Sequence, residues 1–349
     1  MDGFCVNSSD YPKGIEEGLP IQSVIAAGDK HTDTLLPGHA VQIMTGGVAP
    51  KNGDMVIKIE ECKIDEQKVY FQAGEFFPWL NIARRGEDAK QGGCLIARNT
   101  KITPAVGAVA TSVGVTKINV YRKPVVSVVS TGNEVVPCDQ TPQPWQIRNC
   151  NDYSCTMTCR KLGAAVENRL LVSDDKKMMH NELDKAENSD IVLLTGGVSA
   201  GDFDFVPAVL SEKGVKLIFH KIKIRPGKPI WFGKDSKGRA FFGLPGNPVS
   251  VQVNLKLFVE PYIRACSGAS LPSPQFIPFK IDRPITKNFP LEWFFPIKIV
   301  DAEKRLIRPY KTNTSGDFVN FGQSDGIGRM DLDRNTYDVE DEIPVLLWD

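Results

Sequence analysis

Three glycine-containing segments could hold a phosphorylated ligand. They are residues 130–134 (STGNE), 195–204 (TGGVSAGDFD) and 243–248 (GLPGNP). Because glycine has no side chain, a phosphate can approach the backbone N–H groups, and the N-terminus of a following helix favours its negative charge. One such segment alone is more often only a tight turn. Three of them at the strand ends of one sheet predict a phosphate- or nucleotide-binding site.

Carboxylates are expected on the same rim. They are Glu134, Asp174, Asp175, Asp202 and Asp204. A single carboxylate there is more often a helix cap or a solvated side chain, and Asp174 stands where an N-cap would be. Several carboxylates facing phosphates would need a cation, and Mg²⁺ binds one or two carboxylates together with phosphate oxygens.

Basic residues follow in the segment 221–229 (KIKIRPGKP). If this segment continues a strand, alternation places Lys221, Lys223 and Arg225 on one face. They are then either a solvated edge or a clamp for an oxyanion.

Several common chemistries are disfavoured. The chain has no Walker A lysine pattern and no GxGxxG with a downstream acid, which argues against a conventional ATPase or dinucleotide enzyme. It has eight cysteines but no CxxC. Cys155 and Cys159 share a face of a predicted helix, but no second pair completes a tetrahedral metal site. Reduced, buried thiols are the favoured interpretation.

The elements that would position these residues alternate between strand and helix. A continuous apolar strand at 125–130 and a strand at 190–195 are typical of a buried parallel sheet. The full prediction has strands at 125–130, 168–172, 190–195, 215–224 and 240–243, and helices at 151–162, 176–187, 205–213 and 248–266. This order predicts a doubly wound α/β domain, in which ligands bind at the carboxyl ends of the strands.

The rest of the chain predicts a multidomain α/β plus β protein. Residues 1–92 contain short β-branched runs with Gly/Pro punctuation and predict a β-rich domain. Residues 93–121 read as an extended connector, and 122–266 as the sheet domain. A Ser/Pro/Gly-rich linker then leads into short strands, so 267–349 is predicted to be a C-terminal β-barrel.

Charge and hydropathy limit the partners. Lys plus Arg and Asp plus Glu both number 42 in 349 residues. This balance provides no basic footprint for nucleic acid and no polybasic membrane patch. The longest apolar run is too short to span a bilayer, and the N-terminus has no basic-then-apolar signal pattern. The sequence therefore predicts a cytoplasmic protein.

These segments, in this order, resemble the molybdopterin molybdenumtransferase family, which includes the gephyrin E domain. The resemblance covers nearly the whole chain. Several motifs in the same order identify a family far more specifically than one motif alone. The matching elements are MDGF at 1–4, IMTG at 43–46 followed by Pro50, Gly53-Asp54 and Glu60, ARRGED at 83–88, STGNE at 130–134, GGVSAGDFD at 196–204, PGKP at 226–229, LPGNP at 244–248 and Ser315-Gly316.

The resemblance implies an architecture and a reaction. The sheet domain would bind molybdopterin, and residues 93–121 would be the remnant of an extended dimerisation domain. Adenylylated molybdopterin and molybdate would give molybdenum cofactor and AMP, with Mg²⁺. The site would lie between the sheet domain of one protomer of a homodimer and the second domain of its partner. Transient contact with the adenylyltransferase and with molybdoenzymes is also implied.

By this resemblance, the residues that line the site carry over to defined positions. The catalytic acids would be Asp2, Asp88, Glu134, Asp174 and Asp204, of which Glu134, Asp174 and Asp204 would also hold the metal. Ligand-binding residues would be Thr45, Thr131, Gly132, Gly196, Gly197, Ser199, Lys221, Arg225, Lys228, Pro245, Gly246, Asn247 and Pro248. Polarising a pyrophosphate requires positioning and charge stabilisation more than a nucleophile.

The chain also departs from the family pattern. It begins at the MDGF element, so we expect it to lack the usual N-terminal helix and extended strand. Asn133 replaces the usual aspartate, Arg225 a usual lysine and Ala83 a usual arginine. The first two keep hydrogen bonding or charge, whereas the change at Ala83 removes a contact for phosphate or molybdate.

Two alternatives stay open beside the molybdate-inserting enzyme. One is a non-catalytic molybdopterin-binding or scaffolding homologue, because a fold does not determine its function. The other is a molybdopterin adenylyltransferase, which the large additional β domains disfavour.

Overall fold

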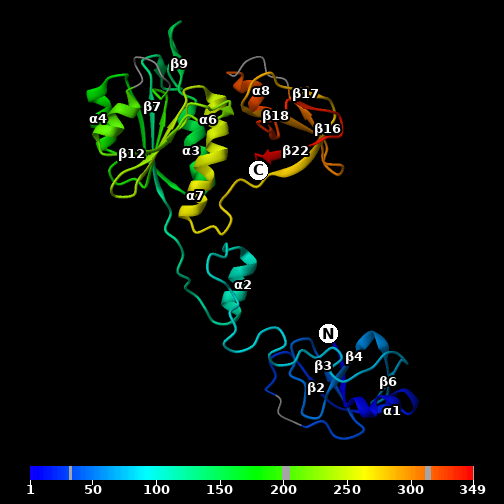
Figure 1. The fold of residues 1–349 in the computed structure, drawn as a ribbon. Coiled ribbons are helices and arrows are strands. Elements are labelled where there is room, and N and C mark those ends of the chain that lie inside the picture. The colour runs from blue at the N-terminus through cyan, green and yellow to red at the C-terminus, as the bar shows by residue number, and fades with distance from the viewer. Residues whose placement is uncertain (31–33, 199–204, 311–315, 349) are drawn as a thin grey trace. The chain divides into compact units, whose positions relative to one another are not determined.

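The chain forms two compact units, which are Met1–Leu95 and Ile96–Asp349. The computed structural model describes residues 1–30, 34–198, 205–310 and 316–348 (Figure 1). In these ranges, no helix combines the length and the apolar character needed to cross a membrane. The finer division at 92/93, 121/122 and 266/267 stays a prediction.

The first unit is built around one sheet with strand order β4-β1-β3-β2-β6-β5. Its strands are β1 (Gly3–Val6), β2 (Leu19–Ile25), β3 (Ala40–Ile43), β4 (Met55–Lys58), β5 (Cys62–Asp65) and β6 (Lys68–Phe71). The predicted β-rich character is confirmed, but the unit also contains helix α1 (Tyr11–Glu16) and the short 3-10 turns η1 (Ser8–Asp10) and η2 (Ile59–Glu61). Buried Tyr11 stacks on Phe71 and so packs α1 against the sheet.

The second unit begins with a helix that buries almost none of its side chains. Helix α2 (Pro104–Ser112) has Thr103 as its N-cap and Pro104 in its first turn, as a helix start requires. Among its residues only Ala110 is buried.

A doubly wound sheet forms the centre of this unit, as predicted. Its strand order is β10-β7-β11-β15-β14-β12. The first four strands in this order run parallel, β14 pairs antiparallel with β15, and β12 pairs antiparallel with β14. Their bounds are β7 (Val125–Thr131), β10 (Ala165–Val172), β11 (Ile191–Thr195), β12 (Lys216–His220), β14 (Trp231–Lys234) and β15 (Ala240–Leu244).

Helices cover both faces of this sheet, and alternation along the strands divides the core. Val126 and Val128 of β7 lie in the cluster that packs against helices α3 (Asn151–Lys161), α6 (Pro248–Asn254) and α7 (Glu260–Cys266). Val129 lies in the cluster on the other face, with α4 (Lys176–Asp184) and α5 (Val206–Glu212). A strand buried on both faces must be apolar throughout, which explains the continuous apolar runs.

The helix predicted at 248–266 is one continuous helical segment, in which a π turn, η3 (Leu255–Val259), joins α6 to α7. The side chain of Asn247 caps it by accepting from the N–H groups of Val249 and Ser250. Pro248 occupies the first turn, where no N–H partner is needed.

The predicted single strand at 215–224 is wrong. Strand β12 ends at His220, and Lys221 has a φ of 61°, so the chain turns there. The next strand, β13 (Ile224–Arg225), leaves the sheet and pairs with a strand of the C-terminal barrel. Alternation therefore does not place Lys221 and Arg225 on one strand face.

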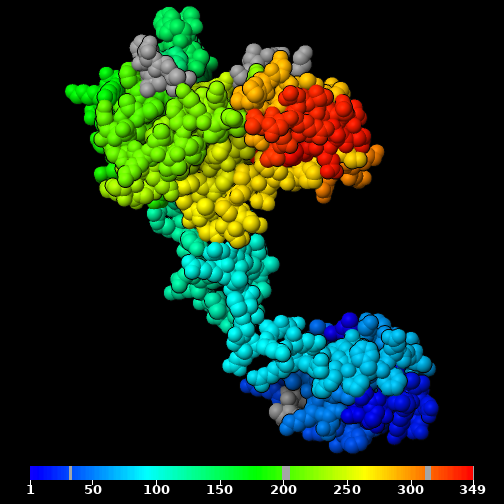
Figure 2. All heavy atoms as spheres, in the orientation of Figure 1, coloured from blue at the N-terminus to red at the C-terminus, as the bar shows by residue number. Residues whose placement is uncertain are grey.

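The C-terminal part forms the predicted barrel. Strands β18 (Glu292–Asp301), β19 (Leu306–Pro309), β16 (Ile277–Ile281), β22 (Glu342–Leu347) and β20 (Gly326–Met330) pair in this order, and β20 closes the ring on β18. Figure 2 shows the orange and red atoms of the barrel adjoining the sheet domain, and a shared core joins Val249 and Val253 of α6 to Phe294 and Phe321. The remaining elements are β17 (Ile285–Thr286), β21 (Thr336–Tyr337) and α8 (Phe318–Gly322), with the small ribbon β8 (Val135–Val136) and β9 (Ile147–Arg148) near the sheet.

Candidate functional site

The carboxyl ends of the parallel strands lie at one edge of the sheet. Thr131 at the end of β7 is in register with Val172 of β10, and Thr195 of β11 is in register with Leu244 of β15. Because these strands are neighbours, the segments at 130–134 and 243–248 flank the glycines that follow β11. The structure thus brings together the predicted residues Thr131, Gly132, Gly196, Gly197, Pro245, Gly246, Asn247 and Pro248.

Gly196 brings the loop after β11 close to the end of β7. Its φ is 91°, and a Cβ there would lie 2.8 Å from both the carbonyl oxygen and the Oγ1 of Thr131. Its N–H donates to the carbonyl of Leu244 at 3.0 Å, which ties the loop after β11 to the end of β15. A side chain at this position would therefore push neighbouring strand ends apart.

The acidic residues on this rim have distinct roles. Asp175, rather than Asp174, caps α4 by accepting from the N–H of Met178 at 2.7 Å. Asp174 instead accepts from the N–H of Asn133 at 3.2 Å, and its own N–H donates to the side-chain oxygen of Asn133 at 3.1 Å. Capping is therefore not the role of Asp174, and an aspartate at 133 would face it with like charge.

Glu134 follows directly on Asn133, and its side chain is exposed. Its backbone carbonyl accepts from the N–H of Ile147, which anchors the β8–β9 ribbon beside the rim. Asp202, Asp204 and Ser199 lie outside the described residues. Among the residues that are described, no group of three or more His, Cys, Asp or Glu side chains could hold a metal ion.

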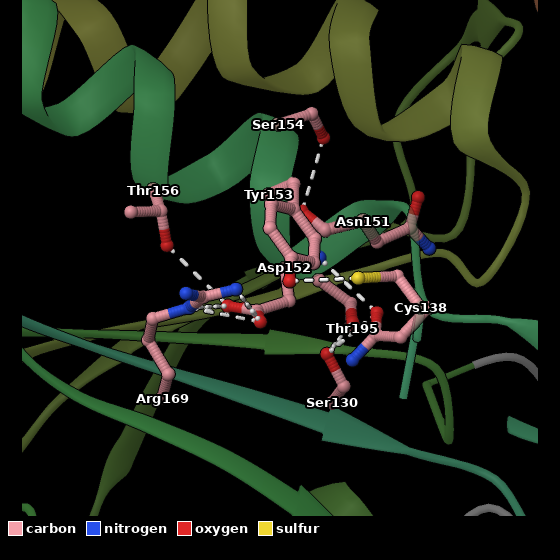
Figure 3. A network of polar contacts seen from close by, with 10 residues as sticks. Ser130, Cys138, Asn151, Asp152, Tyr153, Ser154, Thr156, Arg169 and Thr195 are labelled. Carbon is pink, nitrogen blue, oxygen red and sulfur yellow. Dashed lines mark hydrogen bonds and ion pairs between the residues drawn. The ribbon is translucent and has the colours of Figure 1, made fainter. Parts of the chain in front are cut away.

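A buried polar network lies between the strand ends and α3 (Figure 3). Thr195 Oγ1 donates to Ser130 Oγ at 3.2 Å, and Ser130 Oγ donates to Asn149 Oδ1 at 3.3 Å. The same Asn149 oxygen accepts from the N–H of Asp152 at the start of α3. These contacts connect β7, β11 and α3 at the level where the strands end.

Arg169 of β10 continues this network. Its Nε donates to both carboxylate oxygens of Asp152 at 2.9 and 3.0 Å, and one terminal nitrogen donates at 2.6 Å. The guanidinium also lies 4.4 Å from the ring centroid of Tyr153, whose hydroxyl accepts from the Cys138 thiol (Figure 3). Hydrogen bonding to Asp152 raises the pKa of Arg169, so this cation is permanently charged and holds α3 against β10.

Sequence reasoning missed Asn149 and Asn151. Asn151 Nδ2 donates to the carbonyl of Gly246 at 2.8 Å and so links the start of α3 to the loop after β15. The available signal was the pair of asparagines just before and at the start of a predicted helix, where their side chains bond to backbone groups.

The basic segment lies where the sheet meets the barrel. Lys221, Arg225 and Lys228 are exposed, and no hydrogen bond or ion pair of their side chains occurs with the described residues. The carbon Cζ of Arg225 lies 4.3 Å from the ring centroid of Phe289 in the barrel. The turn after Arg225 is fixed by Asn254 of α6, whose Nδ2 donates to the carbonyl of Gly227 at 3.2 Å.

The first unit brings two further predicted residues together. The N–H and the hydroxyl of Thr45 each donate to Asp2 Oδ1 at 2.8 Å. These two hydrogen bonds hold the pKa of Asp2 below its usual range, and the bond from the backbone N–H has the larger effect. Asp2 is therefore ionised and held in place although it is second in the chain. Asp88 is exposed, and no contact in the described part of this unit joins it to Asp2 or Thr45.

Cys155 and Cys159 agree with the prediction of reduced, buried thiols. Cys155 and Cys159 are fully buried in the core between α3 and the sheet. Burial raises the pKa of Cys159 to about 12 and also raises that of Cys155. Both thiols are therefore protonated at neutral pH.

A cavity of about 610 Å³ lies next to the rim rather than on it. It runs between α3, the helix 248–266 and α8, and its walls include Met157, Leu255, Phe318 and Trp348. Of the predicted site residues that the structure describes, only Pro248 lines it. The cavity is therefore distinct from the strand-end rim.

Family models and individual relatives both relate the chain to molybdopterin proteins. Residues 1–114 match the MoeA N-terminal region (domain I and II), and residues 127–265 match the probable molybdopterin binding domain. The chain is 30% identical over 345 residues to a molybdopterin molybdenumtransferase of Nostoc sp., covering 95% of this chain and 78% of the relative. It is 32% identical over 327 residues to that of Synechococcus elongatus, covering 90% and 79%.

Solved structures include a similar protein over the same extent. The molybdopterin biosynthesis moea protein from Pyrococcus horikosii is similar with a TM-score of 0.78 and 27% identity, covering all of this chain and 86% of the other. The similarity thus extends through both units and the barrel.

Proposed function

Since the chain belongs to the molybdopterin molybdenumtransferase family, we propose that it is an enzyme of molybdenum cofactor biosynthesis. In this proposal it inserts molybdate into the dithiolene of adenylylated molybdopterin and releases AMP. Both family regions that match are involved, because the strand-end rim lies in one and the Asp2–Thr45 pair in the other.

The observation that carries the proposal is the rim of the sheet. Backbone groups of glycine-containing loops meet there, and Gly196 approaches Thr131 so closely that a side chain would not fit. Such a surface suits a phosphorylated ligand, because phosphate oxygens can reach N–H groups. In this proposal the pyrophosphate of the adenylylated pterin binds along the loops at 131–134, 196–198 and 245–248.

Carboxylates beside these loops are suited to a divalent cation. Asp174 is held by Asn133, and Glu134 is the next residue along the chain from that asparagine. Mg²⁺ binds few protein carboxylates and completes its shell with water and phosphate oxygens, so a small group of acids beside a phosphate site fits the ion. Bound Mg²⁺ would neutralise charge on the pyrophosphate. Glu134 and Asp174, with Asp204, would hold it.

Cations nearby would bind the second substrate. Lys221, Arg225 and Lys228 carry exposed positive charge, and molybdate is a tetrahedral dianion. A guanidinium presents several N–H donors to such an oxyanion, and an ammonium adds charge. We assign molybdate binding to these side chains.

The proposed enzyme is a homodimer in which Asp2, Thr45 and Asp88 come to the site from a second copy. Support comes from the connector, where large apolar side chains are exposed. They are Ile102, Val109, Val113, Val115, Ile118, Val120 and Tyr121. Exposed apolar side chains this close together in a chain are typical of a protein interface. Transient contacts with the adenylyltransferase and with molybdoenzymes, and a cytoplasmic location, belong to the same proposal.

AMP release from adenylylated molybdopterin tests the proposal against its alternatives. We expect the full chain to release AMP with Mg²⁺ when molybdate is present, and to release little without it. A scaffold would release none under either condition. An adenylyltransferase would form adenylylated molybdopterin from molybdopterin and ATP, which can be measured in the same reactions.

A further inference from the structure

The barrel holds Arg225 through its strand and through its side chain. Its strand, β13, pairs in parallel with β18, with Arg225 opposite Trp293. The N–H of Glu292 donates to the carbonyl of Lys223 at 2.9 Å, and neighbouring Ile224 is buried in the core that the barrel shares with α6. Both the backbone and the side chain of Arg225 therefore depend on barrel residues.

The contact of Arg225 with the barrel is aromatic. Its Cζ lies 4.3 Å from the ring centroid of Phe289, well within the distance at which a cation is attracted to the face of a ring. Phe289 is itself supported, because its ring meets that of Trp293 edge-on at 5.7 Å. Trp293 in turn contacts Phe295, which is buried in the barrel core, at 5.1 Å. A row of three rings thus connects the guanidinium to the core.

This contact leaves the hydrogen-bonding capacity of the arginine unused. A guanidinium has five N–H donors, and an aromatic ring is not a strong acceptor for them. No acceptor for the Arg225 side chain occurs among the described residues. The ring therefore restricts the long side chain while its donors stay available to an anion, so less rotamer freedom is lost on binding.

We propose that Phe289 is a positioning residue that holds Arg225 ready for molybdate. The inference rests on the proposed use of Arg225 as a molybdate ligand. It makes the C-terminal barrel part of the oxyanion site and not only a structural appendage. Its specific claim is that the aromatic face, and not merely the apolar volume of Phe289, supports binding.

Substitutions that separate ring from volume test this claim. Molybdate affinity would be measured by calorimetry on the full chain. We expect Phe289→Leu, which keeps an apolar side chain and most of its volume but removes the ring, to raise the Kd for molybdate about two- to fivefold. Phe289→Tyr, which keeps the ring, should bind as the unaltered protein does. Phe289→Met serves as a second ring-free variant if Phe289→Leu does not fold.

A matched control exists in the same barrel. Arg329 lies 4.8 Å from the ring of Phe276 and also pairs with Glu292 and Asp331. Phe276→Leu therefore removes an aromatic contact from an arginine outside the proposed site that keeps its ion pairs. This variant should leave the molybdate Kd unchanged. In an Arg225→Ala background, Phe289→Leu should have no further effect, because it acts through the arginine.

The outcomes distinguish this inference from the proposed function. Equal Kd values for the unaltered protein and both ring-free variants would overturn the role of Phe289. So would an undiminished effect of Phe289→Leu in the Arg225→Ala background. If molybdate binds and responds to Phe289 but no AMP is released, the proposed reaction fails and the positioning role stands. Absence of molybdate binding to the unaltered protein would overturn both the positioning role and the assignment of Arg225.

Discussion

Glu134 is the carboxylate whose proposed role can be tested most directly, because its side chain is exposed and no hydrogen bond or ion pair is formed by it in the described part of the chain. Glu134→Gln keeps the shape and removes the charge. We expect molybdate-dependent AMP release to fall at least about tenfold, the effect of losing one charge-assisted contact.

Glu167→Gln is the matched control, since Glu167 is an exposed residue of β10 away from the strand end. Turnover of this variant should equal that of the unaltered chain. A Glu134→Gln enzyme with full turnover would reduce Glu134 to a surface carboxylate, whose neutralisation changes little.

The Asp2–Thr45 pair makes a prediction about protonation. The folded pKa of Asp2 is lowered, so the pair stabilises the fold above the unfolded pKa, about 3.9, and loses this contribution as pH falls through the folded pKa. Thr45→Val removes the hydroxyl donor but keeps the backbone donor. We expect the pKa of Asp2 to rise and still stay below its ordinary value, as followed by NMR titration of its carboxyl group.

Thr45→Ser retains both donors and should leave that pKa as it is. An unchanged pKa in Thr45→Val would mean that the hydroxyl does not bond to Asp2 in solution.

At the scale of elements, the turn after Arg225 depends on a single close approach. Gly227 has a φ of 102°, and a Cβ there would lie 2.6 Å from Oδ1 of Asn254, which is fully buried in α6. Gly238 has a φ of 81° but open space around it. Substitution of either glycine by alanine would strain the backbone, because φ is positive at both positions. Only Gly227→Ala would also displace Asn254.

We therefore expect Gly227→Ala to lower the free energy of unfolding by about 1–3 kcal/mol more than Gly238→Ala, because it adds a clash and breaks the buried Asn254 hydrogen bond. Chemical denaturation of both variants measures the difference. Equal losses would show that the turn tolerates displacement of Asn254. Molybdate affinity should decrease in Gly227→Ala alone, since the turn supports the basic segment.

At the scale of the whole molecule, the proposed homodimer depends on the connector. Val113, just after α2, exposes 56% of its surface. If it is covered in a dimer, Val113→Glu buries a charge in an apolar interface and should shift the protein toward monomer. Analytical ultracentrifugation at several concentrations measures this shift.

Leu271→Glu is the comparison, because Leu271 is 74% exposed and lies outside the connector. Its association should equal that of the unaltered chain. A monomeric unaltered chain, or a Val113→Glu variant that associates equally well, would contradict a dimer formed through the connector.

Local patterns in the sequence predicted most elements of the sheet domain and the kind of site to expect at its edge. The apolar runs that became β7 and β11 are typical of strands buried on both faces. The pair Asn247-Pro248 is typical of a helix start, because asparagine caps the helix and proline fixes φ. Glycines that follow such strands predicted where a phosphate could bind. These features depend on neighbouring residues, so the sequence suffices to predict them.

Only the tertiary structure decided which distant residues meet. Asp174 accepts a hydrogen bond from Asn133, which lies 41 positions away in the sequence. The local sequence suggested Asp174 as the cap of α4, but Asp175 caps this helix. The segment after His220 turned away from the sheet because Ile224 and Arg225 pair with β18 of the barrel, a partner that strand alternation cannot reveal. Phe289 lies under Arg225 for the same reason. Such contacts depend on strand order and domain packing. The periodicity of a segment predicts its secondary structure but does not specify which distant segment it will contact.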